Sequence, residues 1–135
     1  MRPPGSRRNE RGQSLTEMAI SFVVLLLVLA VGVDAGRAYF ALISLREAAE
    51  EGAIFGSLYP ACDTKIAQRA SSSSDNLNIT VNLARPGGTV AGQSLTVTVT
   101  HQFQLTMPFV GAIIGTQTIP LSVSSTSTIL RSTPC

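Results

Sequence analysis

The sequence predicts an α+β fold in which a long N-terminal transmembrane α-helix packs on a small three-stranded antiparallel β-meander. Two observations predict this fold. An uncharged apolar run, Met18–Val33, lies in a stretch without proline that continues to residue 58. After residue 76, Val, Leu and Ile alternate with Thr, Ser and Asn in three segments, which is typical of half-buried strands. The length of 135 residues suits one ordinary domain.

The apolar run is long enough to cross a membrane. Counted from Leu15 it covers 19 residues, interrupted only by Glu17. At about 1.5 Å per residue this nearly fills a hydrocarbon core of roughly 30 Å. The alternative is a buried helix of a soluble domain, but little else in the chain is apolar enough to surround such a helix. We therefore expect a single-pass protein of the cytoplasmic membrane, with its span at about residues 15–34.

The formal net charge of +2 is unevenly distributed along the chain. The first twelve residues carry +3, because Glu10 is opposed by four arginines, Arg2, Arg7, Arg8 and Arg11, and the remaining residues carry −1. A basic flank predicts that this end of the span stays in the cytoplasm, so residues 35–135 are expected to be exported. Outside this flank no basic cluster remains that would suit nucleic acid, and we expect no nucleic-acid partner.

Three kinds of N-terminal segment share this outline. A secretory signal is cut beyond its apolar region, and a cut after Ala35 is conceivable here, although the apolar region is long and Asp34 is unusual at such a site. A lipoprotein signal requires a Cys directly after the apolar run, where this chain has none. A pilin leader is cut before the run, so that the hydrophobic helix is kept. The third kind fits best, with residues 1–12 as the leader.

Gly12, Gln13 and Glu17 carry this interpretation. A peptidase at the membrane face needs an extended and accessible bond, and Gly12 disfavours helix at the boundary between polar and apolar residues. A carboxylate in a membrane helix costs about 2.5–3.5 kcal/mol at its centre and less near its end, so Glu17 calls for a partner. Cleavage after Gly12 creates an ammonium group on Gln13, one helical turn from Glu17. Alternatively, Glu17 is an ordinary solvated residue at the interface.

Three segments together resemble the TadE-type pseudopilins of the tight-adherence branch of type IV pili. They are Arg11–Ala19 (RGQSLTEMA), Asp34–Phe40 (DAGRAYF) and Ala48–Ala53 (AAEEGA). The resemblance covers residues 11–53 and implies a prepilin peptidase that cuts after Gly12, and a product that joins or primes a pilus. Residue 13 is Gln, where many other pilins have Phe or Met, and N-methylation of the new terminus stays open.

We predict one helix over residues 13–58, about 68 Å long, that ends before Pro60. Its exported half, residues 35–58, has an apolar stripe at helical spacing: Ala38, Leu42, Leu45, Ala49, Gly52 and Gly56. Small residues also recur four apart, a spacing that lets helices approach closely: Gly32 and Gly36, then Ala48, Gly52 and Gly56.

Residues 59–135 are predicted to form a small exported β domain with a short helix near residues 61–76. Its strands are expected at residues 77–83, 95–105 and 119–129, with an apolar connection from Met107 to Gly115. Because so small a core gains from a covalent link, we predict a disulfide between Cys62 and Cys135. The alternatives are two free thiols or a bond to another subunit.

We expect no catalytic residues, no metal site and no cofactor. His101 is the single histidine and falls on the predicted core face of a strand, and two cysteines are too few for a zinc site. The favoured function is that of a minor pilin or pseudopilin, a structural subunit rather than an enzyme. Its expected partners are a prepilin peptidase, other pilin subunits, the pilus assembly platform and the lipid bilayer. The alternative is a membrane-anchored or secreted module that binds something outside the cell.

Overall fold

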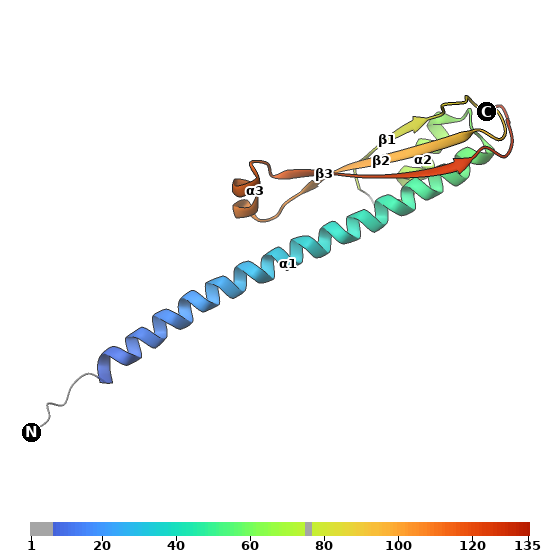
Figure 1. Cartoon of the computed structure of the whole chain (residues 1–135). Coiled ribbons are helices and arrows are strands. Elements are labelled where there is room, and N and C mark those ends of the chain that lie inside the picture. Colours follow the sequence, from blue (N-terminus) through green and yellow to red (C-terminus); the bar gives the residue numbers. More distant parts are fainter. Residues whose placement is uncertain (1–6, 75–76) are drawn as a thin grey trace, which may run out of the picture.

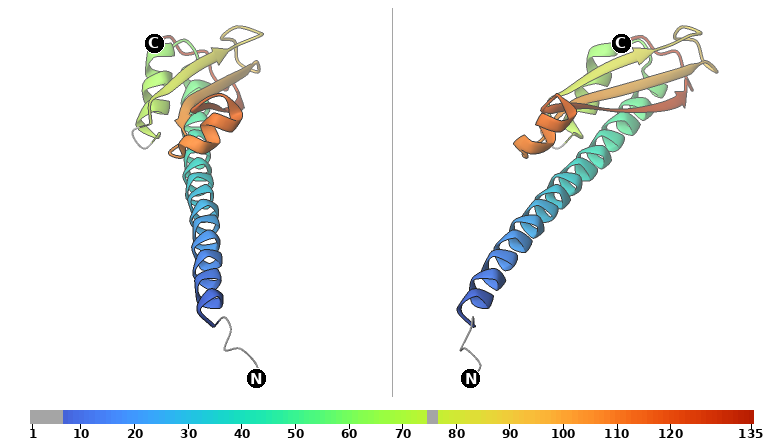
Figure 2. Two further views of the ribbon diagram at one scale, coloured as in Figure 1. Left: turned by 90° about the vertical axis from the view of Figure 1, so that its left-hand side faces the viewer. Right: turned by 60° about the vertical axis from the view of Figure 1, so that its left-hand side comes forward.

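The computed structural model describes residues 7–74 and 77–135, and it has the predicted α+β arrangement. A long helix, α1 (Arg7–Leu58), carries a small sheet domain at its C-terminal end (Figure 1). The elements that follow α1 are α2 (Asp63–Ser72), β1 (Ile79–Ala84), β2 (Ser94–Gln104), α3 (Pro108–Ile114) and β3 (Thr118–Thr128). Both further views show the N-terminal half of α1 standing clear of this domain (Figure 2).

Helix α1 begins earlier than we predicted, at Arg7 instead of Gln13. The reason is that only Gly12 interrupts a run of helix-compatible residues, and a helical Gly costs about 1 kcal/mol relative to Ala. The helix ends at Leu58, two residues before Pro60. Among the described residues, α1 is the one helix long and apolar enough to cross a membrane, and few side chains in its apolar part are buried. That exposure distinguishes it from the core helix of a soluble domain.

The sheet is an antiparallel meander in the order β1-β2-β3. Val99 of the central strand faces Val81 on one side and Val123 on the other. Along β2 the odd-numbered side chains Leu95, Val97, Val99 and Phe103 are buried, as the alternating pattern predicts. His101 lies on the same face but is only half-buried, and its Nδ1 is 2.8 Å from the carbonyl oxygen of Asn78. The histidine thus links β2 to the residue that directly precedes β1.

The hydrophobic core lies between the sheet, α2 and the C-terminal half of α1. Leu45, Ala49 and Ala53 of α1 pack there with residues of α2, of β2 and of the segment that follows β3: Ile66, Ala70, Leu95, Val97, Val99 and Ile129. Small side chains on α1 bring the helix close to the sheet, because a Leu or Phe in their place would hold the two apart. The arrangement buries the apolar face of each element against the other.

The predicted apolar stripe of α1 is slightly out of phase with the observed one. Leu42 is 38% exposed, whereas Ala41 and Ser44 are buried. The sheet covers α1 from one side, and its position buries Ala41 and Leu45 but leaves Leu42 exposed. Of the other members of the stripe, Ala38 is half-buried, and Leu45, Ala49, Gly52 and Gly56 are buried as predicted.

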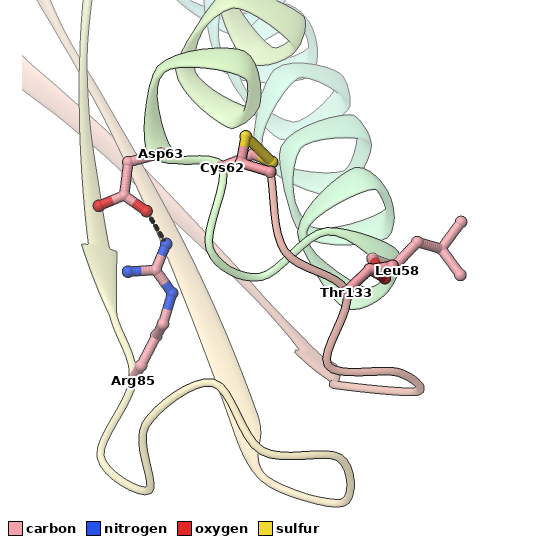
Figure 3. Close-up of a disulfide and its surroundings, with 6 residues drawn as sticks. Leu58, Cys62, Asp63, Arg85 and Thr133 are labelled. Carbon is pink, nitrogen blue, oxygen red and sulfur yellow. Dashed lines mark hydrogen bonds and ion pairs between the residues drawn. A yellow bond between two sulfur atoms is a disulfide. The ribbon is translucent and has the colours of Figure 1, made fainter.

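The end of α1 is tied to the C-terminal tail (Figure 3). Cys62 and Cys135 form a disulfide, with their Cα atoms 5.2 Å apart and a sequence separation of 73 residues. Leu130 donates its backbone N–H to the Ser57 carbonyl at 2.9 Å, and Thr133 donates its hydroxyl to the Leu58 carbonyl at 2.7 Å. The tail thereby satisfies two carbonyl groups that the last turn of a helix leaves free.

Helix α3 occupies the apolar connection, for which the sequence predicted no regular structure. Pro108 stands at its first position, where the missing N–H costs nothing. Gly115 ends it in a left-handed conformation with φ of 81° and donates its N–H to the Gly111 carbonyl at 2.9 Å. The helix projects beyond the end of the sheet, on the side of the N-terminal half of α1 (Figures 1 and 2).

Candidate functional site

The predicted processing site lies near the start of α1. Gly12, Gln13 and Glu17 are all exposed. Helix α1 runs through all three residues without interruption, and the Thr16 hydroxyl donates to the Gln13 carbonyl at 2.8 Å. The peptide bond between Gly12 and Gln13 therefore lies within a helix in the uncut chain. We had expected an extended backbone at this bond. A peptidase that needs an extended bond would have to unwind this turn first.

Gln13 and Glu17 lie four residues apart in a continuous helix, so their side chains are on the same face. In the uncut chain the backbone nitrogen of Gln13 is part of the peptide bond to Gly12 and carries no charge. Only cleavage after Gly12 would place an ammonium group one turn from the Glu17 carboxylate. The pairing of this ammonium group with Glu17 stays a prediction.

The predicted small-residue positions divide into two groups. Gly52 and Gly56 face the core: a Cβ on Gly56 would lie 2.2 Å from Leu95 Cδ2, and one on Gly52 would lie 3.2 Å from Val97 Cγ1. Ala48 is buried in the same core. These three residues serve packing within the chain. A Cβ on Gly32 or Gly36 would meet nothing within 4 Å, so these two positions alone of the five leave room for a second molecule.

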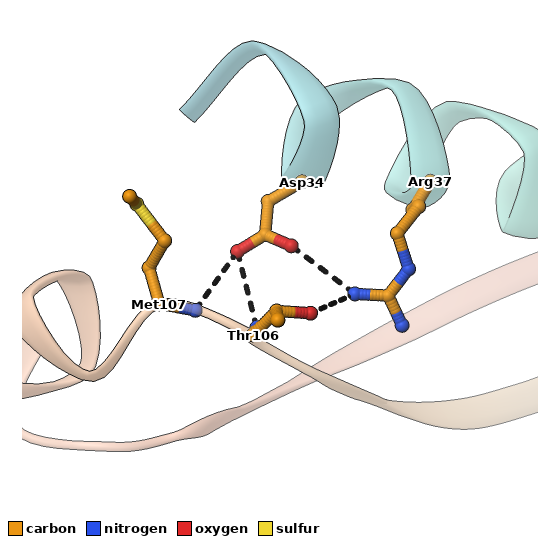
Figure 4. A network of polar contacts seen from close by, with 4 residues as sticks. All are labelled: Asp34, Arg37, Thr106 and Met107. Carbon is orange, nitrogen blue, oxygen red and sulfur yellow. Dashed lines mark hydrogen bonds and ion pairs between the residues drawn. The ribbon is translucent and has the colours of Figure 1, made fainter. Parts of the chain in front are cut away.

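Asp34 is a site residue that the sequence reasoning missed (Figure 4). It is only 6% exposed, although it directly follows the apolar run. Its Oδ2 accepts hydrogen bonds from the backbone N–H groups of Thr106 and Met107, at 3.1 and 3.2 Å. Its Oδ1 pairs with Arg37 at 3.1 Å. The carboxylate therefore joins the end of the apolar run to the start of α3.

Arg37 completes this cluster. Its guanidinium donates to the Thr106 hydroxyl as well as to Asp34. Its central carbon also lies 5.4 Å from the centre of the Phe103 ring, within the range of a cation–π contact. The only feature of the sequence that pointed to this cluster was the opposite charge of Asp34 and Arg37, three residues apart. Such pairs are common on solvated helices.

Next to this cluster lies an apolar groove of about 500 Å³. Three turns of α1 form its floor and Met107 borders it on the side of α3. The residues that line it are Val23, Leu26, Leu27, Leu29, Ala30, Val33, Asp34, Thr106 and Met107. Its surface is almost entirely hydrocarbon, which suits an apolar occupant.

The outer face of α1 beyond the span is charged. Arg46 and Glu50 pair at 2.9 Å, one turn apart. The hydrogen bond that Arg46 donates to Glu50, and then the negative charge of Glu50, raise the pKa of Arg46 above its ordinary value. Across the helix pair, Arg69 of α2 lies 3.6 Å from Glu51 and over the Phe55 ring. These contacts hold α2 on α1. The residues that the structure describes contain no group of three or more His, Cys, Asp or Glu side chains placed to hold a metal ion.

Comparison with known proteins bears on the same part of the chain. The family model described as TadE-like protein matches residues 12–53. This segment is TadE-like. The TadE-like match covers about a third of the chain, from the predicted cleavage site through the apolar run to the buried half of α1. No curated protein and no solved structure matches the chain significantly.

The TadE-like match confirms the resemblance drawn from the sequence. The family is a structural, pilus-associated one and is not known to be enzymatic, so the match favours a pilin-like protein of the tight-adherence pilus. The exposed apolar half of α1 is consistent with anchoring by a single membrane pass. The segment also contains Asp34 and Arg37, which hold the start of α3.

Proposed function

We propose that this chain is a minor pilin or pseudopilin, a structural subunit of a tight-adherence pilus or of a related secretion system. The observation that carries the proposal is the TadE-like match, which begins at Gly12 and includes the whole apolar run. The shape of the molecule agrees with it. An exposed apolar helix with a small domain at one end can rest in a bilayer and later pack against other such helices.

In this proposal a prepilin peptidase removes residues 1–12 at the cytoplasmic face of the membrane. The basic flank with Arg7, Arg8 and Arg11 supports this orientation. Cleavage gives Gln13 an ammonium group one turn from Glu17. The ion pair lowers the cost of holding that carboxylate near the hydrocarbon, and it fixes the register of the new terminus when the subunit is assembled.

Assembly would move α1 from the lipid into a bundle with other pilin subunits, through the pilus assembly platform. The apolar side chains of the span are exposed in the single chain and would then be buried between helices. Gly32 and Gly36 offer the closest approach, because the space above each of them is open. The sheet domain would stay on the outside of the bundle, since its own core already occupies the other half of α1.

Incorporation of a Glu17→Ala variant into sheared filaments tests the proposal. We expect the variant to be inserted and cut, because removing the carboxylate relieves a membrane cost, and yet to be depleted from filaments. Glu47→Ala, which removes a carboxylate from the exposed face of α1 outside the span, is the matched control and should be incorporated normally. Equal incorporation of both variants would show that Glu17 has no role in assembly. If the chain never enters filaments and its removal leaves pilus formation unchanged, the pilin assignment itself is wrong.

A further inference from the structure

The depth of α3 relative to the bilayer follows from the position of Asp34. A hydrocarbon core of about 30 Å takes roughly 20 helical residues, which corresponds to Leu15–Asp34. Tyr39 and Phe40 follow within two turns and are 64% and 71% exposed. Aromatic side chains concentrate at the level of the lipid headgroups. Asp34 therefore lies at the boundary between hydrocarbon and headgroups, on the side of the bilayer that faces the sheet domain.

Asp34 also fixes the start of α3 at that boundary. The Asp34 carboxylate accepts both backbone N–H groups of Thr106 and Met107, and Met107 directly precedes α3. From there α3 projects on the membrane side of the sheet (Figures 1 and 2). The helix thus forms the end of the sheet domain nearest to the bilayer.

The chemistry of this segment suits lipid. From Leu105 to Gln117 the sequence has no charged residue, and α3 itself reads PFVGAII. Ile114 is 55% exposed, which is unfavourable in water and favourable at the boundary of headgroups and acyl chains. The groove between Met107 and α1 is continuous with the exposed surface of the span, so it opens to the same acyl chains.

We propose that α3 is a lipid-binding element that lies in the leaflet facing the sheet domain, with acyl chains filling the groove beside Met107. Asp34 holds it there and so sets the height and tilt of the sheet domain over the bilayer. The inference goes beyond the proposed function, because it concerns the membrane-resident chain and requires only that α1 spans the bilayer.

Quenching of tryptophan fluorescence by lipid tests the proposal. The chain has no tryptophan of its own, so one introduced tryptophan reports its own position alone. Ile114→Trp places a single probe on α3, and Ala112→Trp gives an independent reading from another exposed position of the helix. Val90→Trp is the matched control, since Val90 is 62% exposed and lies in the loop at the opposite end of the sheet. Leu25→Trp reports the middle of the span. Each full-length variant is placed in phosphatidylcholine vesicles whose lipids carry bromine at a shallow or a deep acyl position.

We expect the Ile114→Trp and Ala112→Trp emission to be shifted to shorter wavelength than that of Val90→Trp and to be quenched mainly by the shallow bromines. Leu25→Trp should be quenched mainly by the deep bromines. Adding Asp34→Ala to Ile114→Trp should reduce the shallow quenching, because α3 is then no longer held at the boundary.

Three results would overturn the proposal. The α3 probes could emit like Val90→Trp without quenching, which would place α3 in water. They could be shifted but unquenched, which would mean that protein, such as a second copy of the chain, covers α3 instead of lipid. Absence of deep quenching for Leu25→Trp would show that α1 does not span the bilayer, and the basis of the inference would be lost.

Discussion

The Oδ2 atom of Asp34 lies 3.2 Å from the backbone nitrogen of Met107, and this contact joins two segments 73 residues apart in the chain. Asp34 directly follows the apolar run of α1, and Met107 directly precedes α3. A carboxylate that accepts two backbone N–H groups and pairs with Arg37 is strongly oriented. The contact thereby couples the position of the sheet domain to the end of the span.

Replacing Asp34 by Ala should loosen α3 from α1 while the core remains intact. Loss of an acceptor for two partly buried N–H groups costs about 1–3 kcal/mol, which corresponds to a roughly 5- to 150-fold increase in local opening. Hydrogen exchange should therefore accelerate at Thr106 and Met107 and stay unchanged at Val97. Glu47→Ala is the control and should change neither. Unchanged exchange at Met107 in Asp34→Ala would mean that the contact does not hold α3.

Gly56→Ala should destabilise the folded chain. The added methyl group would lie 2.2 Å from Leu95 Cδ2, and Leu95 is fully buried and has little room to move. Overpacking costs about 1–3 kcal/mol, partly offset by a gain in helix propensity of about 1 kcal/mol. Gly36→Ala meets nothing within 4 Å and should be neutral or slightly stabilising. Urea unfolding of both variants in detergent, followed by circular dichroism, compares them, and equal midpoints would contradict the close packing at Gly56.

The disulfide should be a main source of stability for the sheet domain. Closing a loop of 73 residues reduces the entropy of the unfolded chain and contributes about 4 kcal/mol in the chain-entropy estimate. Cys135→Ser should therefore lower the free energy of unfolding by about this amount. Thr133→Ala removes one hydrogen bond of the same tail and should cost only about 1 kcal/mol. A Cys135→Ser variant as stable as Thr133→Ala would show that the hydrogen-bonded tail alone suffices.

The repetitive parts of the fold could be predicted from the sequence because each has a period. Alternation along Leu95–Phe103 identified the buried face of β2, and the apolar run identified the exposed half of α1. The helical stripe was right at Leu45 and Ala49 but wrong at Leu42, because a period fixes which residues share a face and not where the sheet crosses it.

The remaining features depend on contacts between distant segments. Nothing local to Asp34 indicates that Thr106 and Met107 will supply its hydrogen bonds. Likewise, α3 has seven residues, too few for a helical period to stand out from an apolar loop. The spacing of Gly52 and Gly56 predicted a close approach of another helix, but both face the chain's own core. The same spacing suits either partner, so the sequence does not distinguish them.

The N-terminus of the mature protein tests the central claim most directly. Mass spectrometry of the chain from the membrane fraction should give a first residue of Gln13, and Gly12→Leu should leave the precursor uncut. Ala35→Leu is the matched control: it should be cut normally, whereas a secretory signal cut after residue 35 would be blocked by it. A mature chain that begins at Gln13 is the result that this account predicts. One that begins at Gly36, or that keeps Met1, would contradict it.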